Sequence, residues 1–255
     1  MTEGKQRFFP ALAQLLALEY HCSPEEIDRD NITLTTPILQ PGQRQYSPEA
    51  PFFSMVSTGR GAVITADRAL HPFLREHVKG KEGHWLFELP NLLPLEAELH
   101  SHGYTLSQSH HMFLPARETR VRGSFPLRWL SQEEIFPFYG DGRFPNALCP
   151  EFLPHRPDRL AVCAMDGDQI MGMAGCSEDA PGWLQIGIDV LPAYRSRGVG
   201  SFLVGLLKEE VLRRGGIPFY GTGVSNYHSW NIALNCGFCP AWLEIGARPL
   251  PRDEQ

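Results

Sequence analysis

Apolar residues at regular spacings divide the first half of the chain into short elements. Leucines recur at helical spacing within residues 2–20 and predict a first helix. The run Ser-Pro-Glu-Glu that starts at Ser23 predicts the capped start of a second, short helix. Two further helical patterns alternate with four strand-like runs. The helices are expected at residues 69–78 and 92–102, and the strands at 52–56, 62–65, 84–89 and 105–114. This alternation predicts an α/β unit.

A second series of elements begins after a polar, unpatterned stretch with the sequence RETRVRG at residues 117–123. Strands are expected at residues 127–130, 160–165, 169–177, 183–190, 219–224 and 240–246. A capped helix is expected from Ser131, a long amphipathic helix at 198–214 and a short helix at 229–235. Asp166-Gly-Asp predicts a hairpin between the second and third of these strands. We therefore predict two α/β (α+β) domains, comprising residues 1–120 and 121–255.

Composition and charge narrow the class of protein. The chain has 255 residues, of which 42% are hydrophobic and 20% charged, which is typical of a globular protein. A net charge of −6 provides no general basic face and argues against a nucleic-acid partner. No apolar run approaches the roughly 20 residues that span a membrane, and the start of the chain has no signal-peptide pattern. Six scattered cysteines fit reduced thiols, so we expect a cytoplasmic protein.

The segment from Ile186 to Ser201, with the sequence IGIDVLPAYRSRGVGS, carries the clearest chemical signal. A strand ends, a short turn follows, and glycines open a helix. Such a junction presents unpaired backbone N–H groups and the positive end of the helix dipole to an anion. Gly198 and Gly200 leave the backbone open, and Arg195 and Arg197 add positive charge. The residues alone therefore predict an anion site, and a phosphate group fits it.

Two motifs resemble those of the GNAT acyltransferases. Arg195-x-x-Gly198-x-Gly200 matches the family's R/Q-x-x-G-x-G/A turn, and the segment from Asn226 to Phe238 resembles its N-x-x-A-x-x-L-Y-x-K-x-G-F helix. The resemblance extends over residues 125–247. It implies the GNAT acyl-CoA N-acyltransferase fold with a central mixed sheet. The implied reaction moves an acetyl group from acetyl-CoA to the amine of a small molecule, without a metal.

The resemblance also implies which residues contact coenzyme A. The backbone of Asp189, Val190 and Leu191 is expected beside the pantetheine arm, where two strands splay apart. Asn226 and Ser229 are expected near the thiol. The pyrophosphate is expected on the turn, at Arg195, Ser196, Arg197, Gly198, Val199, Gly200 and Ser201. Partners other than the amine, including a second copy in a homodimer, are left open.

The chain departs from the family pattern at the catalytic positions. The frequent tyrosine acid would fall at Ala233, and the glutamate base found in some members aligns with Gln185. Neither residue can transfer a proton. The candidates for proton transfer are therefore Asp189, Glu178 and His228, each of which also suits an ordinary structural role. A non-catalytic acyl-CoA sensing module is the alternative function, and an interaction scaffold is a third.

Other features have simpler interpretations. Cys236 and Cys239 have metal-site spacing, but no second pair accompanies them. The histidine pairs at 100/102 and 110/111 lack a carboxylate at metal spacing. The N-terminal domain closes on helix, Gly103 and strand, as the C-terminal domain closes on helix, Gly237 and strand. We interpret it as a degenerate half of the same fold without a phosphate turn, suited to forming an acceptor cleft or a dimer.

Overall fold

The computed structural model describes residues 3–119 and 123–251, which divide into two compact units. The N-terminal unit is formed by Phe9–Met112 and the chain from Ala241 onward. The C-terminal unit is formed by Phe113–Pro240, together with the chain up to Phe8. The predicted boundary at residue 120 stays a prediction, because residues 120–122 lie outside the described chain. The last strand returns to the N-terminal unit because long-range pairing, which no local pattern reveals, determines where it lies.

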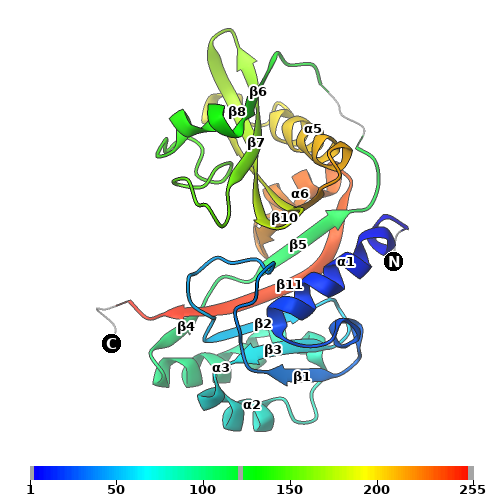
Figure 1. The fold of residues 1–255 in the computed structure, drawn as a ribbon, viewed down its shortest axis with the longest axis vertical. Coiled ribbons are helices and arrows are strands. Elements are labelled where there is room, and N and C mark those ends of the chain that lie inside the picture. The colour runs from blue at the N-terminus through cyan, green and yellow to red at the C-terminus, as the bar shows by residue number, and fades with distance from the viewer. Residues whose placement is uncertain (1–2, 120–122, 252–255) are drawn as a thin grey trace. The chain divides into compact units, whose positions relative to one another are not determined.

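The C-terminal unit is built on a mixed sheet with the strand order β5-β10-β9-β8-β7-β6 (Figure 1). Strands β10 and β9 are parallel. The neighbouring pairs β9–β8, β8–β7 and β7–β6 are antiparallel. The strands are β5 (His110–Pro115), β6 (Leu127–Ser131), β7 (Asp158–Asp166), β8 (Gln169–Ala180), β9 (Trp183–Val190) and β10 (Ile217–Gly223). The helices are α4 (Gln132–Ile135), α5 (Val199–Arg213) and α6 (Tyr227–Asn235).

The two faces of this sheet are covered by different parts of the chain. On one face, the apolar stripe of α5 and the inner side of α6 pack against alternate residues of β9, including Ile186 and Ile188. On the other face, Phe144, Ala147 and Leu148, from the connection between α4 and β7, pack against β7 and β8. Successive β9 side chains therefore point to two separate environments.

Lys208 of α5 is fully buried and joins three segments of the C-terminal unit. Its Nζ donates to the carbonyls of Arg117 at 2.8 Å and Cys236 at 2.7 Å, and lies 3.1 Å from Glu209 Oε1. Burial lowers the pKa of Lys208. Because each donor has an acceptor, the charge is compensated and the ends of α6 and β5 are fixed to α5.

The N-terminal unit has a smaller sheet with the order β1-β3-β2-β11, and β4 pairs with β11. Strands β1 and β3 are parallel, whereas β2 pairs antiparallel with both β3 and β11. Its core joins this sheet to α2 and α3. The elements are α1 (Glu3–Tyr20), β1 (Ile32–Thr35), β2 (Phe53–Ser57), β3 (Ala62–Ala66), α2 (His71–His77), α3 (Leu89–Ser101), β4 (Tyr104–Leu106) and β11 (Phe238–Pro249).

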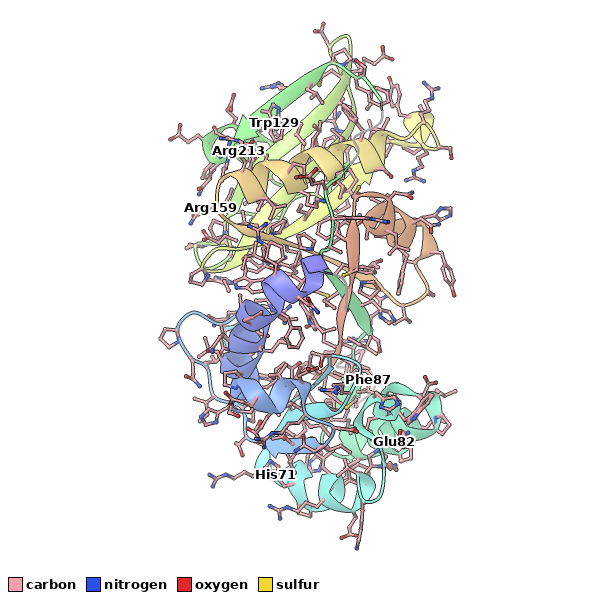
Figure 2. The ribbon with its side chains drawn as sticks, turned by 90° about the vertical axis from the view of Figure 1, so that its right-hand side faces the viewer. His71, Glu82, Phe87, Trp129, Arg159 and Arg213 are labelled. Carbon is pink, nitrogen blue, oxygen red and sulfur yellow. The ribbon has the colours of Figure 1, made fainter. Side chains whose placement is uncertain are left out.

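Three elements of the N-terminal unit differ from the sequence prediction. The run at 84–89 is no strand: Gly83–Phe87 forms a 3-10 helix that starts after Glu82 and leads into α3 (Figure 2). Gly83 lies against the backbone of β3, where a Cβ would overlap Ala62 N, so the chain turns there. The predicted strand at 105–114 is interrupted after β4, where Ser107 exchanges hydrogen bonds with Gly246. Strand β1 was not predicted from the sequence.

Two predicted helix ends are confirmed in detail. Gly103 after α3 and Gly237 after α6 both have left-handed φ angles, of 79° and 78°. A glycine in this conformation is the common end of a helix. The interpretation of the N-terminal unit as a degenerate half of the GNAT fold stays a prediction.

Among the described residues, no helix combines the length and the apolar character needed to cross a membrane.

Candidate acyl donor site

Strands β9 and β10 diverge beyond their first residues. Their paired residues run from Ile217 and Trp183 to Tyr220 and Ile186. Strand β9 nevertheless continues to Val190, and β10 to Gly223. Within the described chain, the last half of β9 therefore pairs with β8 alone. Its other edge presents backbone groups to the gap that opens between the two strands.

The turn after β9 leads directly into α5 and leaves the start of that helix open. Gly198 is the N-cap, with φ 81° and ψ 0° in the left-handed region. The helical hydrogen bonds begin with Phe202 N donating to Gly198 O at 3.0 Å. The N–H groups of Val199, Gly200 and Ser201 thus precede the helical ladder. A Cβ at Gly198 would have no atom within 4 Å, so the space beside the N-cap of α5 is open.

Gly200 serves a different purpose from Gly198. A Cβ added at Gly200 would lie 3.1 Å from Ile232 Cδ1 and 3.5 Å from Val190 Cγ2. Gly200 therefore permits close packing of α5 against both α6 and the end of β9.

The charged side chains of the turn are exposed and partly oriented. Arg195 Nε donates to the carbonyl of Val190 at 3.1 Å, at the very end of β9. The Arg197 guanidinium lies 5.5 Å from the centroid of the Tyr194 ring, whose hydroxyl donates to Asp166 at 3.2 Å. Two guanidinium groups thus stand beside an open helix N-terminus, an arrangement suited to phosphate oxygens.

The start of α6 carries a partly buried hydroxyl pair. Asn226 caps the helix by accepting a hydrogen bond from Ser229 N at 3.1 Å. Ser229 Oγ lies 2.7 Å from the hydroxyl of Tyr220, which is 2% exposed on β10. Burial raises the pKa of Tyr220 to about 12. The Tyr220 hydroxyl therefore stays protonated at neutral pH. Ala233, the position of the family's usual tyrosine, is fully buried in the core.

The opposite face of β9 binds a loop instead of a helix. The register with β8 is regular from Gln185 to Asp189, so Gln185, Gly187 and Asp189 share one face. A Cβ at Gly187 would overlap the carbonyl oxygen of Asn146, so only glycine allows the loop to lie this close. The Asp189 carboxylate accepts hydrogen bonds from Asn146 N at 2.7 Å, Asn146 Nδ2 at 2.6 Å and Ala147 N at 2.9 Å.

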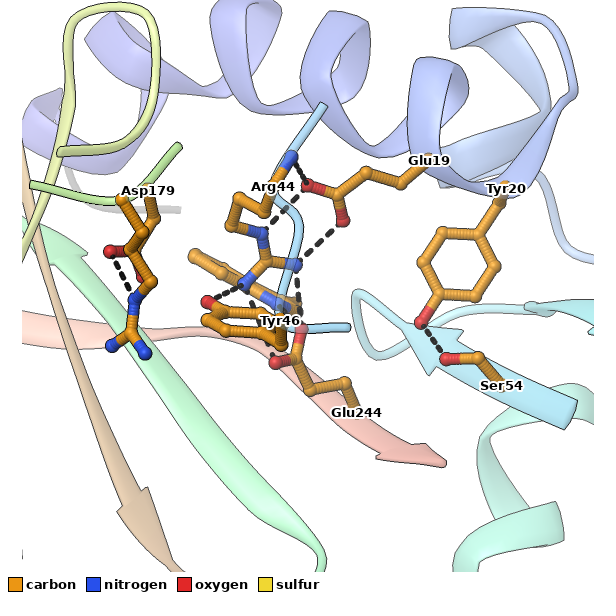
Figure 3. Close-up of polar contacts among 9 residues, drawn as sticks. Glu19, Tyr20, Arg44, Tyr46, Ser54, Asp179 and Glu244 are labelled. Atoms are coloured by element: carbon orange, nitrogen blue, oxygen red, sulfur yellow. Dashed lines mark hydrogen bonds and ion pairs between the residues drawn. The ribbon is translucent and has the colours of Figure 1, made fainter. Parts of the chain in front are cut away.

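Two further buried aspartates bind the same loop from neighbouring strands. Asp158 of β7 accepts a hydrogen bond from Cys149 N at 3.1 Å, and burial raises the pKa of its carboxyl. Asp179 of β8 forms a 2.8 Å ion pair with Arg156 (Figure 3). It also accepts a hydrogen bond from Ser177 Oγ at 2.6 Å. Together with Asp189, they give one aspartate on each of three adjacent strands. We call these three residues the loop-binding aspartates; they hold residues 146–156 against the sheet.

The remaining two candidates for proton transfer lie in different surroundings. Glu178 forms a 2.7 Å ion pair with Arg159 and accepts a hydrogen bond from Gly182 N at 3.0 Å. It lines a hollow at the C-terminal end of α5, about 22 Å along that helix from the turn. His228 is exposed in the first turn of α6, next to Ser229.

Removing the Asp189 side chain should loosen the loop without affecting the turn. In Asp189→Ala, three donors lose their acceptor. For each of these donors that stays buried, the free energy that holds the loop against the sheet falls by about 1–3 kcal/mol. We expect trypsin to cut after Arg143 at least about tenfold faster, measured by mass spectrometry of the native protein over time. Glu178→Ala removes an acid from the other end of the sheet and serves as the control. Equal cleavage of the two variants would show that Asp189 does not hold the loop.

Three residues of the site were not predicted from the sequence: Tyr220, Asp158 and Asp179. Each lies at a strand position outside any motif. Only the register of β7, β8, β9 and β10 brings them near Ser229 or the loop. A weak signal was present, since aspartate is uncommon in the interior of a sheet and needs partners there.

Comparison with known proteins agrees with this geometry. The model of the acetyltransferase (GNAT) family matches residues 125–238. No curated protein sequence matches the chain.

Several solved structures are similar at low identity. A protein described as a GNAT-family acetyltransferase from Novosphingobium aromaticivorans is 14% identical, with 57% of this chain and 66% of that chain covered and a TM-score of 0.46. The present chain thus spans just under two thirds of that relative. A GCN5-related N-acetyltransferase-like protein from Streptococcus suis is also 14% identical, with coverages of 78% and 82% and a TM-score of 0.48. The protein yncA from Salmonella typhimurium, solved with its cofactor acetyl-CoA, is 13% identical, with coverages of 51% and 96% and a TM-score of 0.36.

These similarities assign no substrate or residue role to the present chain. The family match covers the turn, the helices α5 and α6, and the strands β9 and β10. Residues 125–238 therefore match the acetyltransferase (GNAT) family.

Proposed function

We propose that the C-terminal unit transfers an acetyl group from acetyl-CoA to the amine of a small molecule. The observation that carries the proposal is the junction of β9, the turn and α5. Here an unpaired strand edge leads to an open helix N-terminus flanked by two arginines. The helix start is suited to bind an anion, and the strand edge is suited to bind the amide groups of an extended pantetheine arm. One continuous stretch of backbone supplies both.

The residues of this junction fit coenzyme A. The N–H groups of Val199, Gly200 and Ser201 suit a pyrophosphate, and Gly198 leaves its approach open. The free edge of β9 near Asp189, Val190 and Leu191 suits the amide groups of a pantetheine arm. When bound, acetyl-CoA would supply a thioester, whose sulfur leaves as a thiolate.

We assign the sulfur end of the site to Ser229 and Tyr220. A tyrosine with a pKa of about 12 gives up no proton to a thiolate, whose conjugate acid has a pKa of about 8.5. The hydroxyl pair therefore acts by hydrogen bonding: Tyr220 donates to Ser229 Oγ, and Ser229 donates to the sulfur. A donor placed where negative charge develops lowers the barrier, and two linked donors reinforce each other.

For the proton of the amine, we propose His228. Glu178 and Asp189 already accept several hydrogen bonds within the protein, and Glu178 also holds an ion pair. The His228 imidazole is exposed beside Ser229, and histidine is the side chain that most often performs this step. The loop-binding aspartates then shape the acceptor side of the site. A cytoplasmic location is supported by the six cysteines, all of which are free thiols.

A non-catalytic acyl-CoA sensor is the second candidate. It is favoured by Gln185, which lies 3.5 Å from Arg156 Nη2, and by the inert Ala233.

Calorimetry with acetyl-CoA comes first, and the absence of binding up to millimolar concentrations would refute both functions. Thiol release over a panel of small amines then separates them. Release above the rate with acetyl-CoA alone supports the transferase, whereas binding without release from any amine supports the sensor.

A further inference from the structure

The N-terminal unit contains a cavity of its own, with a volume of roughly 460 Å³. All of its lining residues belong to that unit: they come from the end of α1, the segment 39–54, Thr65 of β3, the region 104–110 and residues 244–249 of β11. The volume falls within the usual range of small-molecule sites.

One wall of this cavity carries a buried triad of charged side chains. Arg44 lies between Glu19 of α1 and Glu244 of β11 (Figure 3). Its Nε and Nη2 lie 2.7 Å from the two oxygens of Glu19, and its Nη2 lies 2.8 Å from Glu244 Oε2. The Arg44 side chain is only 3% exposed. When both carboxylates are ionised, they share one guanidinium, which leaves one negative charge in excess.

This excess charge lies in partly desolvated surroundings. Burial raises the pKa of Glu19, and the neighbouring Glu244 charge adds to that increase. Both carboxylates raise the pKa of Arg44 well above its ordinary value. The other formally charged lining residues, Glu49 and Arg248, are exposed and opposite in sign. The net field of the cavity therefore comes from the triad, and it favours a cation.

Glu244 is the member of the triad best able to receive a ligand. Both oxygens of Glu19 accept short hydrogen bonds from Arg44. Glu244 Oε2 is also occupied, by Arg44 and by Trp242 Nε1 at 2.7 Å. Glu244 Oε1 accepts only a long contact of 3.4 Å from Arg44 Nη1 among the described residues. At 19%, the Glu244 side chain is also the most exposed of the three.

Aromatic rings supply the rest of the surroundings. Phe52 and Tyr104 stack with their centroids 4.0 Å apart, and Tyr46, which is 53% exposed, lies at the same cavity. Ring faces attract cations and cover apolar carbon chains. A metal ion fits less well, because Arg44 occupies the carboxylates and no metal-type cluster occurs among the residues that the structure describes.

We propose that this cavity binds a small organic cation, an ammonium group on an aromatic or aliphatic body. The ammonium donates to Glu244 Oε1, and the body lies against Tyr46, Phe52 and Tyr104. This site is separate from the acyl donor site and does not depend on the function proposed above.

The indole N–H groups provide a local test. The probe is phenethylammonium chloride, its uncharged counterpart is 2-phenylethanol, and the full chain is labelled with ¹⁵N. Trp242 Nε1 donates to Glu244, so its signal, assigned with Trp242→Phe, reports on this cavity. We expect a saturable shift of the Trp242 signal with the ammonium and none with the alcohol. The Trp230 signal, from the C-terminal unit, should stay unchanged. Three outcomes would overturn the proposal. They are equal shifts with both probes, the same shift with potassium chloride, and no shift with up to 20 mM probe, a concentration that as a Kd corresponds to a binding free energy of about 2.3 kcal/mol at 25 °C.

A pair of matched variants tests the assigned carboxylate. Glu244→Gln keeps the shape and an acceptor for Trp242 but removes the excess charge, so the affinity for phenethylammonium should fall at least tenfold. Glu49→Gln makes the same change at an exposed lining position and should leave the affinity within twofold of wild type. If Glu244→Gln binds as tightly as wild type, the assignment is wrong. If that variant does not fold, the comparison of ammonium with alcohol in the wild type still decides the question. Acetyl-CoA affinity, measured in parallel, should be unchanged, so failure here leaves the transferase proposal untouched.

Discussion

Gly198→Leu should lower the affinity for coenzyme A by at least about a hundredfold. Its side chain would project into the open space beside the N-cap of α5, where we expect the pyrophosphate to reach the N–H groups of Val199, Gly200 and Ser201. Each hydrogen bond to a charged phosphate contributes about 1.5–3 kcal/mol, and blocking two of them accounts for about a hundredfold change. Calorimetry with coenzyme A measures the loss directly.

Gly215 offers a closely matched control on the same helix. It follows the C-terminal end of α5, has a φ of 83° against 81° for Gly198, and also has open space where a Cβ would lie. A left-handed leucine costs about 1–2 kcal/mol at either position, so both variants should lose similar stability to urea. Gly215→Leu should bind coenzyme A normally. Equal affinities of the two variants would mean that the pyrophosphate does not bind at this turn.

The turn could be predicted from the sequence because its signal is local. A strand, two arginines and two glycines lie within sixteen residues. The backbone conformation that they produce is determined by residues close by in the chain. The same holds for the β7–β8 hairpin and for the glycines that end α3 and α6. Such features need no knowledge of the tertiary structure.

Features that depend on distant partners could not be predicted in this way. Strand β11 begins beside its own helix α6, but residues 243–246 pair with β2, nearly two hundred residues earlier. The apolar run at 84–89 has the composition of a strand, yet Gly83 lies against β3 and Pro90 opens a helix. Tertiary contacts decide between these alternatives, and local propensity does not.

The site residues also divide into those with a local sequence signal and those that depend on distant partners. Gly198 and Arg195 were recognised by motif, whereas Tyr220 became visible only when its hydroxyl was found 2.7 Å from Ser229. The loop-binding aspartates likewise depend on the close approach of residues 146–156 to the sheet. We therefore propose that polar groups from other elements take the place of the family's usual tyrosine and glutamate.

Ser229→Ala should reduce kcat by about a hundredfold in the thiol-release assay, with the affinity for coenzyme A almost unchanged. The lost hydroxyl is the donor that we assign to the leaving sulfur, and removing one such donor costs a hundredfold or more in comparable sites. Tyr220→Phe removes the hydroxyl that orients Ser229 and should have a smaller effect, of about tenfold. Stopped-time assays with 5,5′-dithiobis(2-nitrobenzoate), at saturating acetyl-CoA, measure both variants.

The order of the two effects separates a catalytic role from a structural one. Tyr220 is buried in the core, so a merely structural role would make Tyr220→Phe the more damaging change and lower its stability along with kcat. Ser225→Ala removes an exposed hydroxyl from the same region and should retain full activity. The double variant of Tyr220 and Ser229 should be no slower than Ser229→Ala alone, because Tyr220 acts through Ser229. Independent, multiplying losses in the double variant would contradict the hydrogen-bonded pair.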